Sequence, residues 1–374
     1  MFNRSNSFKV SKQYYDDSNS NCTDSDSDMS IHDEIDEDHQ QNFDKYKTAS
    51  KIVNKAMKQV LNEIKAGQKI LDLAVLGDGI IENELGLIYN KKKLKYGKGI
   101  SMPTCINVNH IAAFTSPLQD NNQVLKDGDV IKVEMGVHVD GFICLTAETK
   151  YLSYEGDPNK EKIENLLKAI DLCKQKVKGA LKVDKKTLGV VKAFEEASTK
   201  HEVSLVSADV DNYDHLPGLF CYQLSRGFVD SYNEDDDDPS HKMIIVNKKV
   251  DIKNKDEVFR TNDVMVIDIM MSTGTGKMAE RENIMPSVYI RNPDVHYSLK
   301  MKASRKTYNE FAKRGDVYPC SLRSFENNKM RLGLKECVKH GVLEPFQILS
   351  EKDGEFIAQC KFTTIIKFNK NHYL

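Results

Sequence analysis

A pattern that occurs twice in the chain restricts its possible folds more than any other feature. The first copy, VLKDGDVIKVEMGVHVDGFICLTAET, covers residues 124–149 and reads as a polar turn, a buried strand, a bend at Gly136 and a second strand after Gly141. β-Branched and apolar residues that alternate between Gly and Asp are typical of a β-hairpin. The second copy, VFRTNDVMVIDIMMSTGTG, begins at Val258 and keeps the same order. The sequence therefore predicts two half-domains built on one plan.

Alignment of the two copies places Glu134 and Asp268 at equivalent positions. Two half-domains that share one plan would bring these strand-end carboxylates towards a common axis. The alternative is an accidental likeness, since buried strands with polar turns resemble one another. Helical segments mixed with alternating strands favour an α+β domain, in which helices cover one face of an antiparallel sheet.

Charge is distributed unevenly along the chain. Residues 14–44 contain eleven Asp or Glu and no Lys or Arg, so the rest of the chain is basic. Acidic blocks rich in Ser and Asn are usually disordered and solvated. We therefore expect a disordered tail over residues 1–44 and a folded domain over residues 45–370. A functional alternative is that the tail screens the basic surface from polyanions until a partner displaces it.

The folded part divides into recognisable segments. Apolar residues at helical spacing predict helices over residues 49–64, 70–77, 161–177 and 187–201, and period-two alternation predicts a closing strand within residues 355–368. Residues 230–242, DSYNEDDDDPSHK, are expected to form an acidic surface insertion. Residues 297–340 form a subregion that is dense in basic side chains.

The cellular location follows from what the sequence lacks. The chain has no apolar run of about 18 residues, so we expect no membrane span. The start, MFNRSNSFKV, lacks the apolar core of a secretory signal. Eight Cys are scattered without a Cys-x-x-Cys pair, which suits a reducing compartment. We expect a cytoplasmic or nucleocytoplasmic monomer.

Several longer strings carry a family resemblance: SMPTCINVN, VLKDGDVIKVEMGVHVDGF, LKMKASRKTYNEF, PCSLRSFE and LKECVKHGVLEPFQILSEKDGEFIAQCKFT. Together they resemble the type-two methionine aminopeptidase family and, more closely, the proliferation-associated proteins that bind the ErbB-type receptor. The likeness extends over about residues 45–370. It implies the pita-bread fold, with two pseudo-symmetric halves around an antiparallel sheet and helices on the outside, which agrees with the repeat.

The resemblance also implies a site. Active members of the family hold two metal ions with two Asp, one His and two Glu, and a further His contacts the substrate. Hard divalent cations need such oxygen-rich cages. In this chain the two Asp correspond to Glu134 and Leu145, the two Glu to Asp268 and Lys361, and the substrate His to Phe114. The ligand His belongs near residues 226–230, where SRGFVDSYN contains no imidazole.

This set predicts a non-catalytic protein without metal or cofactor. Leu145 cannot ligate a metal and Lys361 would repel one, so Glu134 and Asp268 would instead form a salt-bridged plug with Lys361. Two alternatives stay open: a shifted metal site that uses His110, His138 or His215, and a diverged metalloaminopeptidase that acts on N-terminal Met.

A second candidate site is basic. The predicted nucleic-acid-binding residues are Lys300, Lys302, Arg305, Lys306, Lys313, Arg314 and Arg323, with Tyr308, Phe311, Tyr318 and Phe325 among them. Basic side chains release counterions from phosphates and aromatic rings can stack on bases. The alternative is a helix with a solvated basic face and its aromatic residues in the core. The segments 91–98 and 248–255 add positive charge.

The resemblance implies partners for this face. Relatives of this type associate with ribosomes, bind structured RNA and take part in ribosome assembly, translation and growth control. Ribosomal RNA of the large subunit is therefore the expected partner, and nascent chains or signalling proteins are further candidates. We also expect the protein to enter the nucleus or nucleolus. A third hypothesis is a peptide- or protein-binding module that uses the old cleft, lined by Phe114, Ile111 and Leu145.

Overall fold

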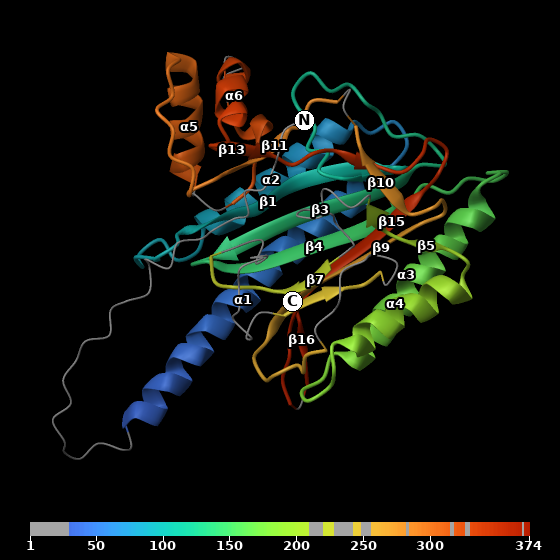
Figure 1. Ribbon diagram of the computed structural model, residues 1–374, viewed down its shortest axis with the longest axis horizontal. Helices are drawn as coiled ribbons and strands as arrows, with labels where there is room; N and C mark the ends of the chain where they lie inside the picture. The colour runs from blue at the N-terminus through green and yellow to red at the C-terminus, as the bar shows by residue number, and fades with distance from the viewer. Residues whose placement is uncertain are drawn as a thin grey trace.

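A large antiparallel sheet forms the centre of the computed structural model, and helices surround it (Figure 1). The structure describes residues 30–208, 220–227, 242–247, 256–281, 284–314, 318–325, 330–368 and 370–374, without the side chains of residues 30–40, 208 and 330. The α-helices are α1 (Ser30–Glu63), α2 (Ile70–Gly86), α3 (Lys160–Ala180), α4 (Leu188–Lys200), α5 (Lys302–Arg314) and α6 (Met330–Lys339), with a 3-10 turn at Leu322–Ser324. No described helix has the length and apolarity needed to cross a membrane.

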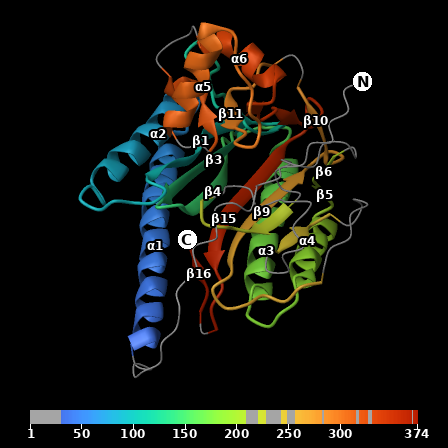
Figure 2. The same ribbon diagram turned by 60° about the vertical axis from the view of Figure 1, so that its left-hand side comes forward.

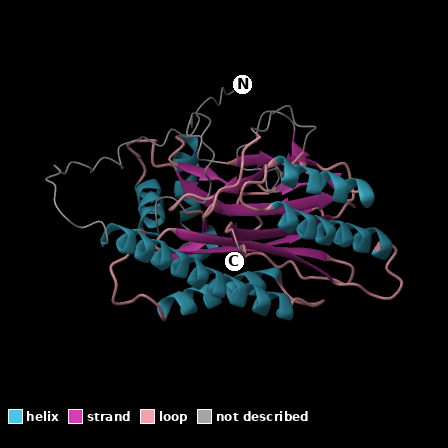
Figure 3. Cartoon of the chain, turned by 90° about the horizontal axis from the view of Figure 1, so that it is seen from below, coloured by secondary structure: helices cyan, strands magenta, loops and turns pink. Residues whose placement is uncertain are grey.

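The strands form one large and two small sheets. The large sheet has the order β1-β3-β4-β15-β9-β7-β8, from β1 (Lys98–Val108), β3 (Val130–Val139), β4 (Phe142–Tyr151), β15 (Ile357–Ile365), β9 (Val264–Ser272), β7 (Phe220–Gln223) and β8 (Met243–Ile245), with β16 (His372–Tyr373) paired to β15 and β5 (Ser204–Leu205) to β9. One small sheet contains β2 (Ile111–Ala113), β14 (Leu349–Ser350), β10 (Lys277–Glu280) and β6 (Ser207–Ala208), and the other contains β12 (Cys320–Ser321), β11 (Val288–Arg291) and β13 (Leu343–Pro345). Figure 3 shows the strands running through the middle of the molecule.

Each half of the large sheet has its own pair of helices. Helices α1 and α2 contribute to one hydrophobic core with β1, β3 and β4, whereas α3 and α4 contribute to another with β9 and β15. Burial of an apolar helical face on a sheet is the main stabilising term for such a layer. The α+β fold with helices on the outside is therefore confirmed.

The two halves also repeat the same turn. The backbone N–H of Lys126 donates to the Asp129 carboxylate over 2.8 Å, and that of Arg260 donates to the Asp263 carboxylate over 2.7 Å. A long, fully buried strand follows each turn, β3 in one half and β9 in the other. Each copy also starts on a single β-bridge: Lys69 with Val124, and Lys186 with Val258. The internal repeat is thus a structural one, and the accidental alternative is excluded.

The first copy forms the predicted hairpin, with a different turn. Strand β3 continues through Gly136, where we expected a bend, and the chain reverses at Asp140 and Gly141, which have φ values of 55° and 81°. Gly136 is needed for packing, because a Cβ there would collide with the Leu145 side chain on the paired strand. Paired residues 136 and 145 leave room for only one side chain.

The second copy does not form a hairpin, contrary to the prediction. After β9 the chain passes Gly276 and enters β10, which pairs with β14 and β6 in a small sheet. Strand β15 takes the place beside β9 instead. Long-range pairing with the closing strand thus replaces the local partner that the repeat suggested.

The predicted boundary of the N-terminal tail differs from the structure. Helix α1 begins at Ser30, so the prediction of a disordered tail up to residue 44 is wrong for residues 30–44 (Figure 1). Acidic side chains near a helix N-terminus complement the helix dipole, and the buried anchors Tyr46 and Ala49 hold the same helix to the core. Residues 1–29 and most of the predicted acidic insertion at 230–242 lie outside the described residues.

Candidate functional site

One row of residues crosses four adjacent strands at the centre of the large sheet. The register pairs Glu134 of β3 with Ala147 of β4, Ala147 with Lys361 of β15, and Lys361 with Asp268 of β9. Directly paired residues of neighbouring strands place their side chains on the same face. The two halves therefore bring Glu134 and Asp268 together, with Lys361 between them.

The Lys361 ammonium joins the two carboxylates. Its Nζ donates to Glu134 Oε1 and lies 3.0 Å from Asp268 Oδ2. Gln359 Nε2 donates to the other oxygen of Asp268 over 2.8 Å. Glu134, Asp268 and Lys361 are 0%, 2% and 5% exposed. The predicted salt-bridged plug is present as three charges in the protein interior.

The charges of this plug depend on one another. Burial alone would lower the pKa of Lys361, but Asp268 and Glu134 hold it well above its ordinary value. Burial raises the pKa of Glu134; Lys361 opposes this rise and Asp268 adds to it. Two carboxylates share one cation, and Glu134 Oε2 has no hydrogen-bond partner among the described residues. The Lys361 ammonium is therefore the fixed charge of the cluster at neutral pH.

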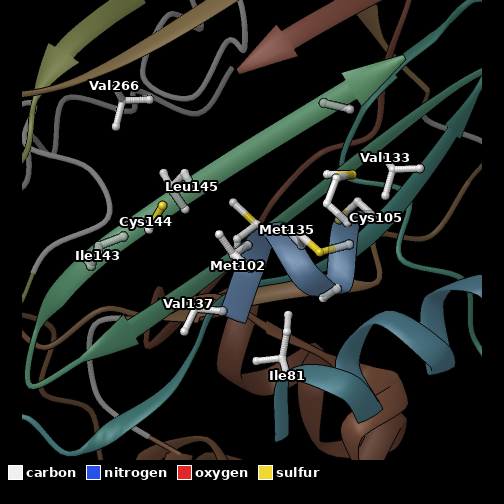
Figure 4. Close-up of a cluster of buried hydrophobic side chains, with 14 of the residues drawn as sticks. Ile81, Met102, Cys105, Val133, Met135, Val137, Ile143, Cys144, Leu145 and Val266 are labelled. Carbon is white, nitrogen blue, oxygen red and sulfur yellow. The ribbon is translucent and has the colours of Figure 1, made fainter. Parts of the chain in front are cut away.

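Leu145 completes this region with an apolar side chain. Its backbone N–H and carbonyl both bond to the Thr363 hydroxyl, over 3.0 and 3.1 Å. Its side chain is 1% exposed and belongs to the cluster of Figure 4, with Met102 and Met135. A hydrocarbon side chain supplies no electron pair to a metal, so this position adds packing only.

Phe114 also contributes to the core. It is 5% exposed and meets the ring of Phe346 edge-on, with 4.9 Å between centroids. Its φ of 66° is unusual for an aromatic residue, so the surrounding packing must hold it there. Because Phe114 and Leu145 are both buried, they do not line an open cleft of the kind that the peptide-binding hypothesis requires.

The alternative histidines are engaged elsewhere. His110 Nε2 lies 2.6 Å from Arg281 Nη2. Burial lowers the pKa of the His110 imidazole, and the positive charge of Arg281 lowers it further. His138 stacks on Tyr318 with 4.0 Å between centroids, and burial lowers its pKa to about 4. His215 lies outside the described residues. Within the described chain, no group of three His, Cys, Asp or Glu side chains could hold a metal ion.

The second candidate site lies on α5, at one end of the molecule (Figure 1). Six of the predicted basic residues are exposed there: Lys300, Lys302, Arg305, Lys306, Lys313 and Arg314. Some are partly engaged, since Lys313 pairs with Glu310 over 2.9 Å and Arg305 Nη1 donates to two backbone carbonyls of the segment before the helix. Lys302 and Lys306 have no ion pair in the described chain.

Arg323 does not belong to this face, and its inclusion was wrong. It is 8% exposed, pairs with Asp78 of α2 and donates to the Ser116 hydroxyl over 2.8 Å and to the Pro117 carbonyl over 2.9 Å. An arginine with several internal acceptors is a structural link between segments that are distant in sequence. It is unavailable to a phosphate.

The aromatic residues of the subregion are in its core. Phe311 is 1% exposed and Phe325 is 7% exposed, and their centroids lie 4.9 Å apart. Tyr318 is also buried, and Tyr308 packs against the same small cluster between α5 and α6. The alternative of a solvated basic face above an aromatic core is therefore correct for Phe311, Tyr318 and Phe325, whose buried rings cannot stack on bases.

Comparison with known proteins identifies the family. A family model for metallopeptidase family M24 matches residues 44–219. The chain is 34% identical to an Arabidopsis thaliana protein named ErbB-3 binding protein 1, across 87% of this chain and 78% of that protein. The chain belongs to the family of ErbB-3-binding and proliferation-associated proteins. It is also 29% identical to a Schizosaccharomyces pombe protein named curved DNA-binding protein, across 84% of this chain and 78% of that protein.

A solved structure supports the fold of this ErbB-3-binding protein family member. The structure of a thermophilic Arx1 matches with a TM-score of 0.73 at 22% identity, across 88% of this chain and 89% of that chain. At this level of identity the likeness concerns the fold alone. With the family match, it confirms the pita-bread fold of the methionine aminopeptidases.

The sequence prediction omits two polar residues beside the charged row of this family member, Gln359 and Thr363. The signal was present, since alternation in AQCKFT places Gln359, Lys361 and Thr363 on one face of the closing strand. Their partners could not be inferred, because Asp268 and Leu145 belong to other strands.

Proposed function

We propose that this protein is a non-catalytic, pseudo-aminopeptidase member of its family that binds structured ribosomal RNA through the basic face of α5. The observation that carries the first part is the Lys361 ammonium, which pairs with both Glu134 and Asp268 in the interior. A divalent cation at these carboxylates would have to displace or approach a buried positive charge. Leu145 and Phe114 supply no replacement ligand.

The first test is metal uptake together with methionine release. Purified protein is expected to take up no stoichiometric Mn²⁺ or Co²⁺ and to release no methionine from a peptide with an N-terminal Met, since the Lys361 ammonium lies between the two carboxylates. Isothermal titration calorimetry and amino-acid analysis measure the two quantities. An active methionine aminopeptidase serves as the control. Tight stoichiometric metal uptake, with or without activity, contradicts the proposal.

The RNA partner is supported by the charge of α5. Lys302, Arg305, Lys306, Lys313 and Arg314 all lie on this one helix of thirteen residues, against Glu310 as its acidic residue. Exposed, unpaired lysines gain from counterion release when they meet phosphates. The name of the curved DNA-binding protein, a relative, supports a nucleic-acid partner. The ribosome as its source, and a role in ribosome assembly or translation, rest on the family resemblance.

The second test reverses charge on α5. The double variant Lys302→Glu, Lys306→Glu is expected to bind large-subunit RNA about tenfold more weakly and to show a shallower salt dependence, because two phosphate contacts are lost. Co-sedimentation with ribosomes at about 50 and about 200 mM salt measures both effects. The double variant Lys192→Glu, Lys200→Glu on α4 is the matched control, because both lysines are exposed and the change of charge is the same. Equal binding by both variants would show that α5 is not the RNA face.

A further inference from the structure

A second basic surface lies at the other end of the molecule from α5. The β15–β16 hairpin lies between α1 and α3 (Figure 2). It is held there by Asn371, whose side chain donates to the Leu181 carbonyl, by Tyr373, whose hydroxyl donates to the Lys178 carbonyl over 3.3 Å, and by His372, whose ring meets Phe43. The hairpin patch consists of Lys47, Lys178, Lys367, Phe368, Lys370 and Tyr373.

The four lysines of the hairpin patch have no ion pair among the described residues. Lys47 and Lys367 each place Nζ 4.2 Å from the centre of the Phe43 ring, and Lys178 places its Nζ 4.4 Å from that of Tyr373. Asp44 is the acidic residue that lies next to Phe43 along α1. These ring contacts fix the direction of three ammonium groups while leaving their charge without an anion.

The positive charge of these lysines affects the neighbouring imidazole of His372. Burial lowers the pKa of His372, and Lys367, Lys47 and Lys370 lower it further. Three of the four lysines therefore converge near His372, whereas Lys178 lies beside Tyr373, the next residue of the hairpin. Such a concentration is unfavourable in the free protein and favours the approach of a polyanion.

Exposed aromatic rings distinguish this patch from α5. Phe368 is 72% exposed and Tyr373 is 41% exposed, whereas Phe311 and Phe325 beside α5 are buried. An unstacked base can lie on an exposed ring while its phosphates meet nearby lysines. A duplex keeps its bases stacked inside and offers phosphates alone.

We propose that the hairpin patch binds single-stranded nucleic acid, with Phe368 and Tyr373 stacking on bases and the four lysines contacting the backbone. This inference is independent of the α5 face, which it complements as a second contact of different selectivity. The acidic segment at residues 14–38 of the same chain is the competing occupant on charge alone. It is less suited to the patch because its rings, Tyr14, Tyr15 and His32, are few and unevenly spaced, whereas a single strand of nucleic acid presents a base and a phosphate at every residue.

The test compares two oligonucleotides. Fluorescence anisotropy is measured with a labelled oligouridine of about twelve nucleotides and with a duplex RNA of similar length. Phe368→Ala is expected to weaken binding of the single strand about tenfold and to leave duplex binding unchanged. Leu332→Ala is the matched control, because Leu332 is an equally exposed apolar residue, at 71%, on α6. Lys370→Glu is expected to weaken single-strand binding and flatten its salt dependence, whereas Lys200→Glu is not.

Several outcomes would overturn the proposal. Equal effects of Phe368→Ala and Leu332→Ala would exclude stacking at the hairpin, and equal losses for single strand and duplex would exclude single-strand selectivity. Binding of a synthetic peptide of residues 14–38 in place of the oligouridine would assign the patch to the acidic segment. When Phe368→Ala is added to the α5 double variant, it should weaken single-strand binding by the same factor. Failure of the α5 proposal can therefore be distinguished from failure of this one. Thermal unfolding of each variant checks that the fold is intact.

Discussion

Replacement of Lys361 by Met is expected to lower the free energy of unfolding by about 3–5 kcal/mol, the cost typical of removing one partner from a buried ion pair. The variant would leave Glu134 and Asp268 buried close together without their shared cation. Urea denaturation followed by circular dichroism measures the change. Met preserves most of the aliphatic length of the lysine, so lost packing contributes little.

A matched variant separates charge from packing. Lys361→Met combined with Glu134→Gln and Asp268→Asn removes both carboxylates along with the ammonium, and is expected to recover most of the lost stability. Replacement of a whole buried ion cluster by well-packed hydrophobic residues is often neutral or stabilising, and the uncharged Gln and Asn likewise remove the cost of burying two unpaired carboxylates. If the single variant is as stable as the original protein, the row of charges does not hold the two halves together in the way described.

The second large effect concerns Lys132, a fully buried lysine on β3. Its Nζ donates to the Asn109 carbonyl over 2.7 Å, and burial lowers its pKa to about 7 against a weak opposing effect of Asp129. The unfolded chain holds this proton up to about pH 10.5, so it binds more protons than the folded protein between about pH 7 and 10.5. The contribution of Lys132 to the unfolding free energy is therefore most favourable above about pH 10.5. It becomes less favourable as the pH falls to about 7, where the buried amine takes up a proton.

We therefore expect the unfolding free energy to rise between about pH 7 and 8.5, by up to about 1.4 kcal/mol per pH unit. The Lys132→Met variant should lose this slope. The window ends there because buried thiols such as Cys144, whose pKa is raised to about 12, act in the opposite direction above their ordinary value of 9.0. Urea titrations at several pH values make the comparison. An identical slope in both proteins would show that Lys132 keeps its proton.

Lys361 and Lys132 differ in how far their roles can be predicted from the sequence. Lys361 could be inferred, because the repeat aligns Glu134 with Asp268 and the family resemblance places a lysine opposite them. Lys132 gives no such signal: it reads as an ordinary charged residue at an alternating position of a half-exposed strand. Its buried ammonium is held by the Asn109 carbonyl, which also accepts from the backbone N–H of Ile357, and neither contact can be read from the residues around Lys132.

The errors have one physical origin. Arg323 was assigned to a basic surface because its neighbours in sequence are basic, yet Asp78 lies far away along the chain and holds it inside. The bend at Gly136 and the second hairpin were inferred from local turn residues. In the structure, cross-strand packing with Leu145 and long-range pairing with β15 determine these positions.

By itself the sequence determined the α+β fold, its two equivalent halves and the meeting of Glu134 and Asp268, because strand periodicity and an internal repeat can be read directly along the chain. The family resemblance added Lys361 to this pair. Only the tertiary structure decided which charges are buried, which rings are exposed and which strand lies next to β9. Those features depend on contacts between segments that are far apart in sequence, where the energy of burial outweighs local preference.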